Sequence, residues 1–204
     1  MAIKSHEELE YQEFLVSDIR ENLVSAEIYQ QFISNPKPNI NVLDFGCGLG
    51  YVMLYYAENF KNIENIHVYG CDYQEELLDL CWKKIVQKKL NNVTPFFMPE
   101  KSLVNFPQWV PKMDHIFLSF CLSTVHNKEE FLISIANQLN TEGIIHIIDW
   151  KKNTDNENLK ILYPTNNRFE LENMKTVLSK INFRIIKLNI NSDFYYVIDT
   201  KPEN

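Results

Sequence analysis

The stretch Val42-Leu43-Asp44-Phe45-Gly46-Cys47-Gly48-Leu49-Gly50 decides the fold of this chain. Apolar residues lead into three glycines at alternate positions, and an apolar helical pattern follows. A buried strand that ends in a glycine turn and continues into a helix has this pattern. Glycine tolerates positive φ and has no side chain, so the backbone of such a turn can approach a ligand closely. The stretch therefore predicts a ligand-binding turn at the end of a strand.

The glycine spacing distinguishes between cofactors. A dinucleotide turn of the form G-x-G-x-x-G needs a glycine at position 51, where this chain has Tyr51. Asp44, two residues before Gly46, would repel a diphosphate and suits a cationic ligand instead. The pattern D-x-G-x-G-x-G resembles the first motif of the class I methyltransferases that use S-adenosylmethionine. A tight turn without any ligand is the alternative.

Helical and strand patterns alternate along the rest of the chain. A continuous apolar run such as 144–148 is typical of a central parallel strand, because helices cover both faces of a parallel sheet. We therefore predict an α/β fold with a doubly wound, mostly parallel seven-stranded sheet, an antiparallel C-terminal strand pair and N-terminal cover helices. The expected strands lie at about 40–46, up to Asp72, 93–98, 113–120, 144–148, 184–189 and 194–200. The expected helices lie at 49–60, 74–88, through Phe131, Leu132, Ile135 and Leu139, and near 170–181.

The domain organisation follows from this order. Residues at about 7–34 have apolar positions at four-residue spacing and predict one or two helices over the site. We find no repeat or linker, and expect a single methyltransferase domain over 1–204. In it, 1–37 is a helical cover and 38–204 is a Rossmann-like core.

Composition excludes some partners. The 204 residues carry 20 Lys and Arg against 27 Asp and Glu, a formal net charge of −7, which argues against a broad nucleic-acid surface. No apolar run reaches the roughly 18 to 20 residues that span a membrane. The first residues do not resemble a signal peptide, so we expect a cytoplasmic protein. The oligomeric state stays open.

The four cysteines indicate neither a metal site nor disulfides. Cys47, Cys71, Cys81 and Cys121 form no C-x-x-C pair. Buried free thiols are the expectation, because reduced cysteine packs as a small apolar residue. Cys121 lies where the chain leaves a strand at the expected active face.

Asp72 ends the second expected strand, where an acid can accept hydrogen bonds from a ribose diol. The alternative is a cap on the following helix, and the two roles are compatible. An NAD-binding protein would also use an acid at this position to bind the ribose. Tyr73 is placed to pack on an adenine.

The resemblance to class I methyltransferases assigns further cofactor contacts. It implies that Asp44 holds the methionine amino group and that Gly46, Cys47 and Gly48 pass close to the amino acid and ribose. Later in the chain, Glu100 is the candidate partner of the adenine amino group.

Two other stretches complete the expected cofactor site. Lys101 follows Glu100, and an exposed loop is the alternative role for both. Ser119 and Phe120 end the fourth strand and resemble the family's fourth motif, which lies beside the transferable methyl group.

His126 and Asp149 are the candidate catalytic residues. His126 follows the fourth strand, and its pKa near neutrality suits a general base, although it could equally flank the next helix. Asp149 ends the fifth strand in Asp149-Trp150-Lys151, which resembles a signature of small-molecule methyltransferases. An ordinary strand end is the alternative for Asp149.

Together these features predict S-adenosylmethionine-dependent methyl transfer to a small-molecule acceptor, by in-line attack on the sulfonium methyl. The first alternative is a non-catalytic regulatory protein that binds S-adenosylmethionine or a nucleotide. The second is an NAD-dependent oxidoreductase, which Tyr51 and Asp44 disfavour. The acceptor itself is left open.

Overall fold

The computed structural model describes residues 24, 26–99, 105–152, 168 and 170–203. In these residues the strands form one sheet of order β3-β2-β1-β4-β5-β7-β6. The strands are β1 (Asn41–Phe45), β2 (His67–Asp72), β3 (Val93–Phe97), β4 (Met113–Ser119), β5 (Leu139–Trp150), β6 (Phe183–Asn189) and β7 (Tyr195–Pro202). Strands β1 to β5 pair in parallel, and β7 is antiparallel to both β5 and β6.

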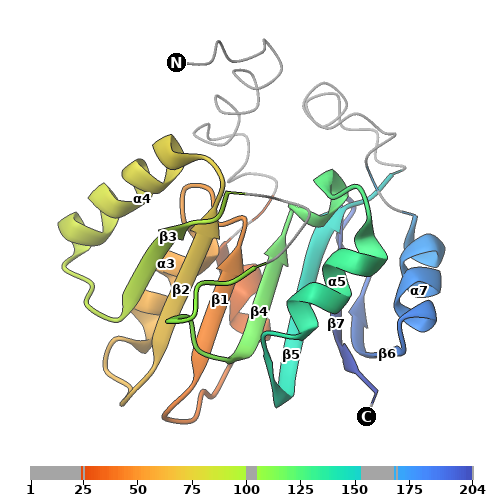
Figure 1. The fold of residues 1–204 in the computed structure, drawn as a ribbon, viewed down its shortest axis with the longest axis horizontal. Helices are drawn as coiled ribbons and strands as arrows, with labels where there is room; N and C mark the ends of the chain where they lie inside the picture. The colour runs from red at the N-terminus through yellow and green to blue at the C-terminus, as the bar shows by residue number, and fades with distance from the viewer. Residues whose placement is uncertain (1–23, 25, 100–104, 153–167, 169, 204) are drawn as a thin grey trace.

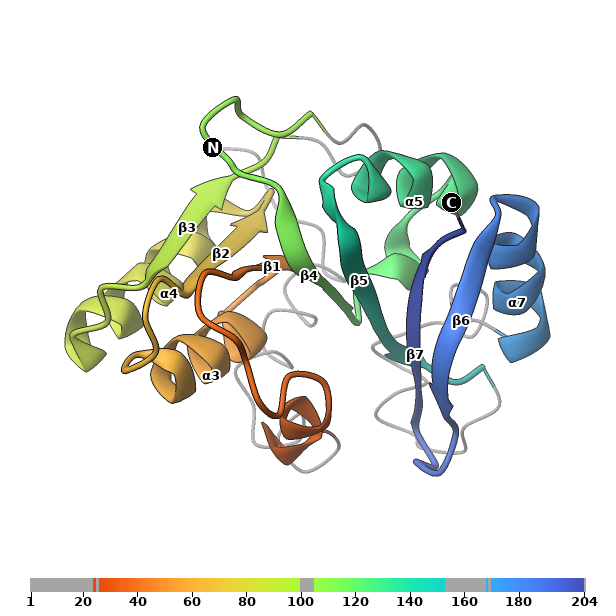
Figure 2. The ribbon, with the colours of Figure 1, turned by 90° about the horizontal axis from the view of Figure 1, so that it is seen from below.

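Helices cover both faces of the sheet. Helices α5 and α7 lie on one face, and α3, α4 and η1 lie on the other (Figures 1 and 2). The helices are η1 (Ala26–Gln31), α3 (Tyr51–Phe60), α4 (Glu75–Lys88), η2 (Leu122–Thr124), α5 (Lys128–Ala136) and α7 (Leu171–Lys180). The doubly wound architecture with an antiparallel C-terminal pair confirms the predicted fold class. Within the described ranges, no helix has the length and hydropathy needed to span a bilayer.

The strands are buried on both faces because their alternate side chains enter two separate cores. In β4, Phe117 packs in the core under α3 and η1, whereas Ile116 and Leu118 pack in the core under α5 and α7. Val42 and Leu43 of β1 divide in the same way. This period of two explains why the strands read as continuous apolar runs in the sequence.

One expectation differs from the structure. Leu139 was expected on the helix with Phe131 and Ile135, but α5 ends at Ala136 and Leu139 begins β5. Leu139, which is half-buried, keeps the helical spacing by coincidence, because the chain turns back toward the sheet and enters the strand. In the expected N-terminal cover, the described part contains the short 3₁₀ helix η1, and the other expected helical residues lie outside the described ranges apart from Val24 and 32–34.

A chain of polar side chains, in which His146 and Asp199 are buried and His115 is half-buried, crosses β4, β5 and β7 on the η1 side. The ring nitrogens His115 Nδ1 and His146 Nε2 lie 2.9 Å apart, and His146 Nδ1 lies 2.8 Å from Asp199 Oδ1. Phe32, just after η1, packs edge-on against His146 at 5.0 Å between ring centroids. Burial lowers the pKa of His146, and burial together with His146 lowers the pKa of His115 to about 3. Both imidazoles are therefore neutral in the folded protein near pH 7.

We expect the free energy of unfolding to fall as the pH is lowered. Unfolded histidine binds a proton near pH 6.5, whereas folded His115 stays neutral to about pH 3. The stability that neutral His115 contributes is therefore complete above about pH 6.5 and is lost progressively toward about pH 3. Urea unfolding between about pH 7.5 and pH 5 measures this loss.

The variant His115→Gln is the control, because glutamine keeps a donor and does not titrate. It should lose less stability over the same pH range than the parent protein. Asp149, whose pKa burial raises to about 6, works in the opposite direction in both proteins and cancels in the comparison. Equal losses in the two proteins would contradict the assignment.

Candidate functional site

A pocket opens at the carboxyl ends of β1, β2 and β4, the edge of the sheet at the top of Figure 1. Ligands bind at this edge in doubly wound folds, where the strand order reverses. In this sheet the order reverses between β1 and β4. The pocket is lined by Asp44, Phe45, Gly46, Cys47, Gly48, Leu49, Tyr51, Val52, Cys71, Asp72, Tyr73, Gln74, Leu77, Met98, Ser119, Phe120, Cys121, Thr124 and Val125.

The glycine turn has the backbone conformation that its sequence predicts. Gly46, Gly48 and Gly50 have φ values of +70°, +51° and +78°. The amides of Gly46 and Cys47 both donate to the Cys71 carbonyl, at 2.8 and 2.9 Å, which fixes the turn to the end of β2. A Cβ atom added to Gly48 would meet no atom within 4 Å. The turn therefore presents open space to the pocket at Gly48.

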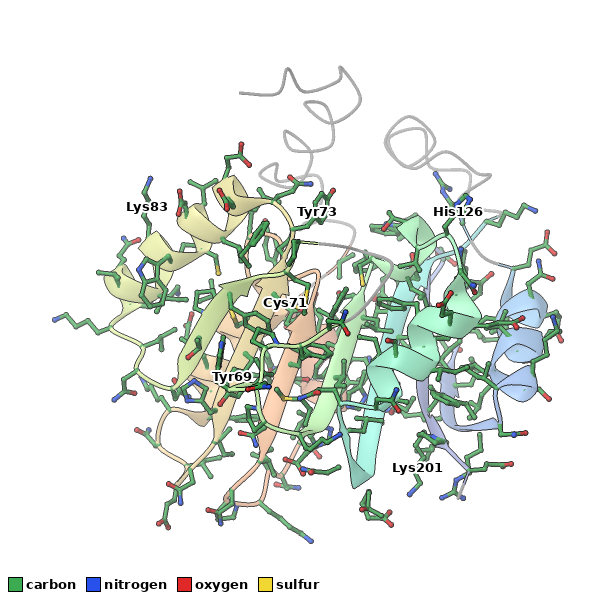
Figure 3. All side chains as sticks on the ribbon, viewed as in Figure 1. Tyr69, Cys71, Tyr73, Lys83, His126 and Lys201 are labelled. Carbon is green, nitrogen blue, oxygen red and sulfur yellow. The ribbon has the colours of Figure 1, made fainter. Side chains whose placement is uncertain are left out.

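Asp72 joins the glycine turn to the start of α4. Its Oδ2 accepts the Gly48 amide at 2.8 Å, and its Oδ1 accepts the Gln74 amide at 3.0 Å. The side chain is 7% exposed and lines the pocket. Tyr73 is exposed beside it, at the upper end of β2 in Figure 3, and its hydroxyl accepts from the Gln74 side chain at 2.7 Å. The N-cap of α4 is Gln74, not Asp72, and at this helix Asp72 binds the amide of the cap residue, so the expected alternative of a helix cap is wrong for Asp72.

Asp44 is the second carboxylate of the pocket. It is 1% exposed, and its Oδ2 accepts the Met53 amide of α3 at 3.1 Å. Among the described lining residues, Asp44 and Asp72 are the acids, and none is Lys, Arg or His. The charge that these residues place around the pocket is therefore negative, which favours a cationic ligand group over a diphosphate.

Ser119 and Phe120 line the opposite side of the pocket, at the end of β4. The segment Phe120–Val125, which we call the wall, continues from them through η2. Cys121 Sγ–H donates to the Phe45 carbonyl at 3.3 Å, so the wall leans on the end of β1.

The fold gathers the four cysteines around the glycine turn. Cys47, Cys71 and Cys121 line the pocket, and a Cβ atom on Gly50 would lie 2.4 Å from Cys81 Sγ. All four are free thiols, and burial raises the pKa of each. Cys47, Cys71 and Cys81 are buried, as expected. The described residues contain no group of three or more potential ligands that could hold a metal ion.

Neither of the two candidate catalytic residues lines the pocket. His126 is exposed in the bend between η2 and α5, on the same edge of the sheet (Figure 3). Asp149 is buried behind the wall, where its oxygens accept the amides of Ser123 and Trp150, each at 2.8 Å. Neither side chain is among the lining residues. Glu100 and Lys101 lie outside the described residues.

Several residues that line the pocket were not predicted from the sequence as site residues. Most follow directly on expected strand ends or occupy the first turn of a helix, and this position is the signal that would have found them. They are Phe45, Leu49, Tyr51, Val52, Cys71, Gln74, Leu77, Met98, Cys121, Thr124 and Val125. They are mainly apolar, so a core position explains their residue types equally well.

Comparison with solved structures shows the same fold in known methyltransferases. An S-adenosylmethionine-dependent methyltransferase from Aquifex aeolicus aligns with 21% identity and a TM-score of 0.78, covering 97% of this chain and 98% of that chain. A TehB-like methyltransferase from Corynebacterium glutamicum aligns with 14% identity and a TM-score of 0.65, covering 97% and 98%. The plantazolicin methyltransferase BpumL, in complex with S-adenosylhomocysteine, aligns with 16% identity and a TM-score of 0.66, covering 97% and 89%.

A search of curated proteins found no match. The family model described as a methyltransferase domain matches residues 36–198, which is most of the chain. The match includes the glycine turn, Asp72 and the ends of β4 and β5. The chain therefore belongs to the methyltransferase domain family and is an S-adenosylmethionine-dependent methyltransferase with a Rossmann-like fold.

Proposed function

We propose that the protein transfers the methyl group of S-adenosylmethionine to a small-molecule acceptor, with the pocket between β1, β2 and β4 as the cofactor site. The observation that carries this proposal is the convergence of residues from distant parts of the chain. Asp44, the glycine turn, Asp72 and the end of β4 line one pocket. They come from three strands that are neighbours in the sheet but not all consecutive in sequence.

The residues present fit this cofactor. A carboxylate oxygen can accept more than one hydrogen bond, so Asp72 can bind ribose hydroxyls while it still accepts the amides of Gly48 and Gln74. The open space above Gly48 lets a ligand lie against the backbone. We assign the methionine end to Asp44, Gly46 and Cys47.

The remaining cofactor contacts are assigned from the positions of the residues in the pocket. Tyr73, exposed beside Asp72, is placed to pack on the adenine. Ser119 and Phe120 lie across the pocket from the glycine turn, beside the group that reacts. Glu100 and Lys101 stay proposals for the adenine side.

The negative charge of the pocket supports this cofactor over NAD. The cofactor supplies a methyl group activated by a positively charged sulfonium. Asp44 and Asp72 attract a cationic ligand and would repel a diphosphate. Tyr51, in place of the last glycine of the dinucleotide turn, also lines the pocket.

The protein acts mainly by alignment and by exclusion of water. The lining thiol of Cys121 is protonated near neutral pH, because burial raises its pKa. An acceptor that is already nucleophilic needs only to be held in line with the methyl group, and proximity and orientation supply a large part of the rate. For an acceptor that must lose a proton, His126 is the candidate general base, since it lies on the same edge of the sheet and is open to solvent.

A small acceptor fits the chain better than a macromolecule. A formal net charge of −7 does not provide the cationic surface that nucleic acids require. One of the similar structures is a plantazolicin methyltransferase. Release of S-adenosylhomocysteine, measured across panels of phenols, amines, thiols, RNA and protein, tests the proposal. Turnover confined to small molecules is the expected result, and turnover confined to RNA or protein would contradict it.

We expect Asp72→Asn to weaken S-adenosylhomocysteine binding by about 1–3 kcal/mol, because the charged acceptor of the ribose hydroxyls is lost. This corresponds to about 5- to 150-fold in the dissociation constant, measured by isothermal titration calorimetry. Asp79→Asn, the same exchange at an exposed site on α4, is the control and should bind like the parent. Unchanged affinity in Asp72→Asn would remove Asp72 from the site.

A further inference from the structure

The wall contains a backbone conformation that is unusual for its residue. Phe120 has a φ of +57°, in the left-handed region. The other described non-glycine residues with positive φ are three asparagines and a lysine that ends α4. A left-handed conformation costs a bulky residue about 1–2 kcal/mol, so it persists only where the surroundings impose it. Phe120 combines this strain with a position in the pocket.

Trp150 holds the ring of Phe120. The two rings stack with centroids 4.1 Å apart at an interplanar angle of 29°, and Tyr195 packs edge-on against Phe120 at 6.0 Å. The Phe120 amide donates to the Ile148 carbonyl at 2.7 Å, which extends the β4–β5 pairing by one residue. Trp150 is 1% exposed, at the end of β5 and paired with Tyr195 of β7. The ends of three strands therefore fix this ring.

Asp149 holds the next part of the wall. Its buried carboxylate accepts the Ser123 amide at 2.8 Å with one oxygen and the Trp150 amide at 2.8 Å with the other. Farther along, Lys128 Nζ donates to the Val125 carbonyl at 2.6 Å. The wall is thus fixed at Phe120, Ser123 and Val125, and the first two supports come from adjacent residues of β5.

This arrangement sets the width of the pocket. At one side of the pocket, a Cβ atom on Gly46 would lie 3.0 Å from the Cβ of Cys121, so the wall and the glycine turn are in contact there. The wall cannot move closer to the turn at this point, and a movement away from the turn would widen the pocket. The supports behind the wall therefore have a direct consequence for binding.

We propose that Asp149 and Trp150 are positioning residues that hold the wall Phe120–Val125 at the distance from the glycine turn that cofactor binding requires. The proposal rests on the assignment of this pocket to the cofactor. Asp149 then acts through the backbone of Ser123 rather than on the acceptor. Because Phe120 lines the pocket and its ring stacks on Trp150, we expect cofactor binding to change the surroundings of the indole.

The test uses the fluorescence of Trp150 in a protein with no other tryptophan. Trp82 and Trp109 are 51% and 55% exposed, and both lie outside the pocket lining, so Trp82→Phe with Trp109→Phe leaves Trp150 as the reporter. S-adenosylhomocysteine is added while calorimetry on the same sample measures binding. The expected result is a saturable change in Trp150 emission with the calorimetric dissociation constant. Binding by calorimetry with unchanged emission would overturn the proposal.

Variants of the supports are then compared in the otherwise unchanged protein. Trp150→Leu should weaken S-adenosylhomocysteine binding by about tenfold or more, and Trp150→Phe, which keeps a ring to stack on Phe120, should restore most of it. Trp109→Leu is the matched control, because Trp109 packs on Tyr69 and Phe96, away from the wall, and should bind like the parent. Parent-like affinity in Trp150→Leu would overturn the role of Trp150.

Asp149→Asn is a second variant for the binding measurement, and it keeps the volume of the side chain. It should also weaken binding, because the amide group replaces the charged acceptor of the Ser123 N–H. If Trp150→Leu fails to fold, this variant and the fluorescence titration decide the proposal. Failure of the parent protein to bind S-adenosylhomocysteine would contradict the assigned cofactor site as well, whereas normal binding by parent and variants would contradict the positioning role alone.

Discussion

Gly48→Asn should lose at least about 100-fold in affinity for S-adenosylhomocysteine, because the new side chain occupies the space in which the ligand lies against the turn. A Cβ atom at this position meets no protein atom within 4 Å, so the side chain enters the pocket without a clash. Asparagine is chosen because this chain already uses it at positive φ, at Asn39, Asn65 and Asn182. The backbone of the turn is therefore kept, and binding is measured by calorimetry.

The melting temperature of Gly48→Asn separates a filled pocket from a damaged fold. A cooperative transition close to that of the parent is expected, since asparagine adopts the left-handed region at little cost. The reverse exchange, Asn182→Gly in the turn between α7 and β6, is the control and should bind like the parent. Normal binding by a folded Gly48→Asn would mean that the turn does not contact the ligand.

Gly50→Ala should destabilise the protein by about 2–5 kcal/mol, the sum of left-handed strain and overpacking. Gly50 has a φ of +78°, and a Cβ atom there would lie 2.4 Å from Cys81 Sγ and 3.3 Å from Leu54 Cγ and Met53 Cε. These atoms belong to the core between α3 and α4, which has no space for a methyl group. Urea unfolding gives the loss in the free energy of unfolding.

A double-mutant cycle tests the cause of this loss. Cys81→Ala removes the sulfur that the new methyl group would meet, so Gly50→Ala should cost less in the Cys81→Ala protein than in the parent. The remaining loss measures the strain of a left-handed alanine. Equal losses in both proteins would show that the sulfur is not the obstacle.

The sequence predicts the parts of the fold that depend on local pattern. β1, the glycine turn and the end of β2 at Asp72 are found because apolar runs, glycines and an acid occupy fixed positions relative to one another. The antiparallel C-terminal strands follow from their short polar turn. Leu139 shows the limit of periodicity, since an apolar residue at helical spacing begins a strand instead.

The composition of the site is less predictable than the fold, because it depends on contacts between distant segments. Cys47, Cys71 and Cys121 are scattered in sequence and meet only because β1 lies between β2 and β4 in the sheet. The direction of the Asp149 side chain is likewise decided by packing, since its amide partner Ser123 belongs to η2, which is distant in sequence from β5. The strain at Phe120 has no signature in the sequence, where a phenylalanine at a strand end is ordinary.

Calorimetric titration of the parent protein with S-adenosylmethionine, S-adenosylhomocysteine and NAD tests the central claim most directly, because it asks which cofactor the pocket between β1, β2 and β4 accepts. We expect dissociation constants of roughly micromolar order for the first two compounds and no binding of NAD. Binding of NAD alone, or no binding of either adenosyl compound by folded protein, would contradict it.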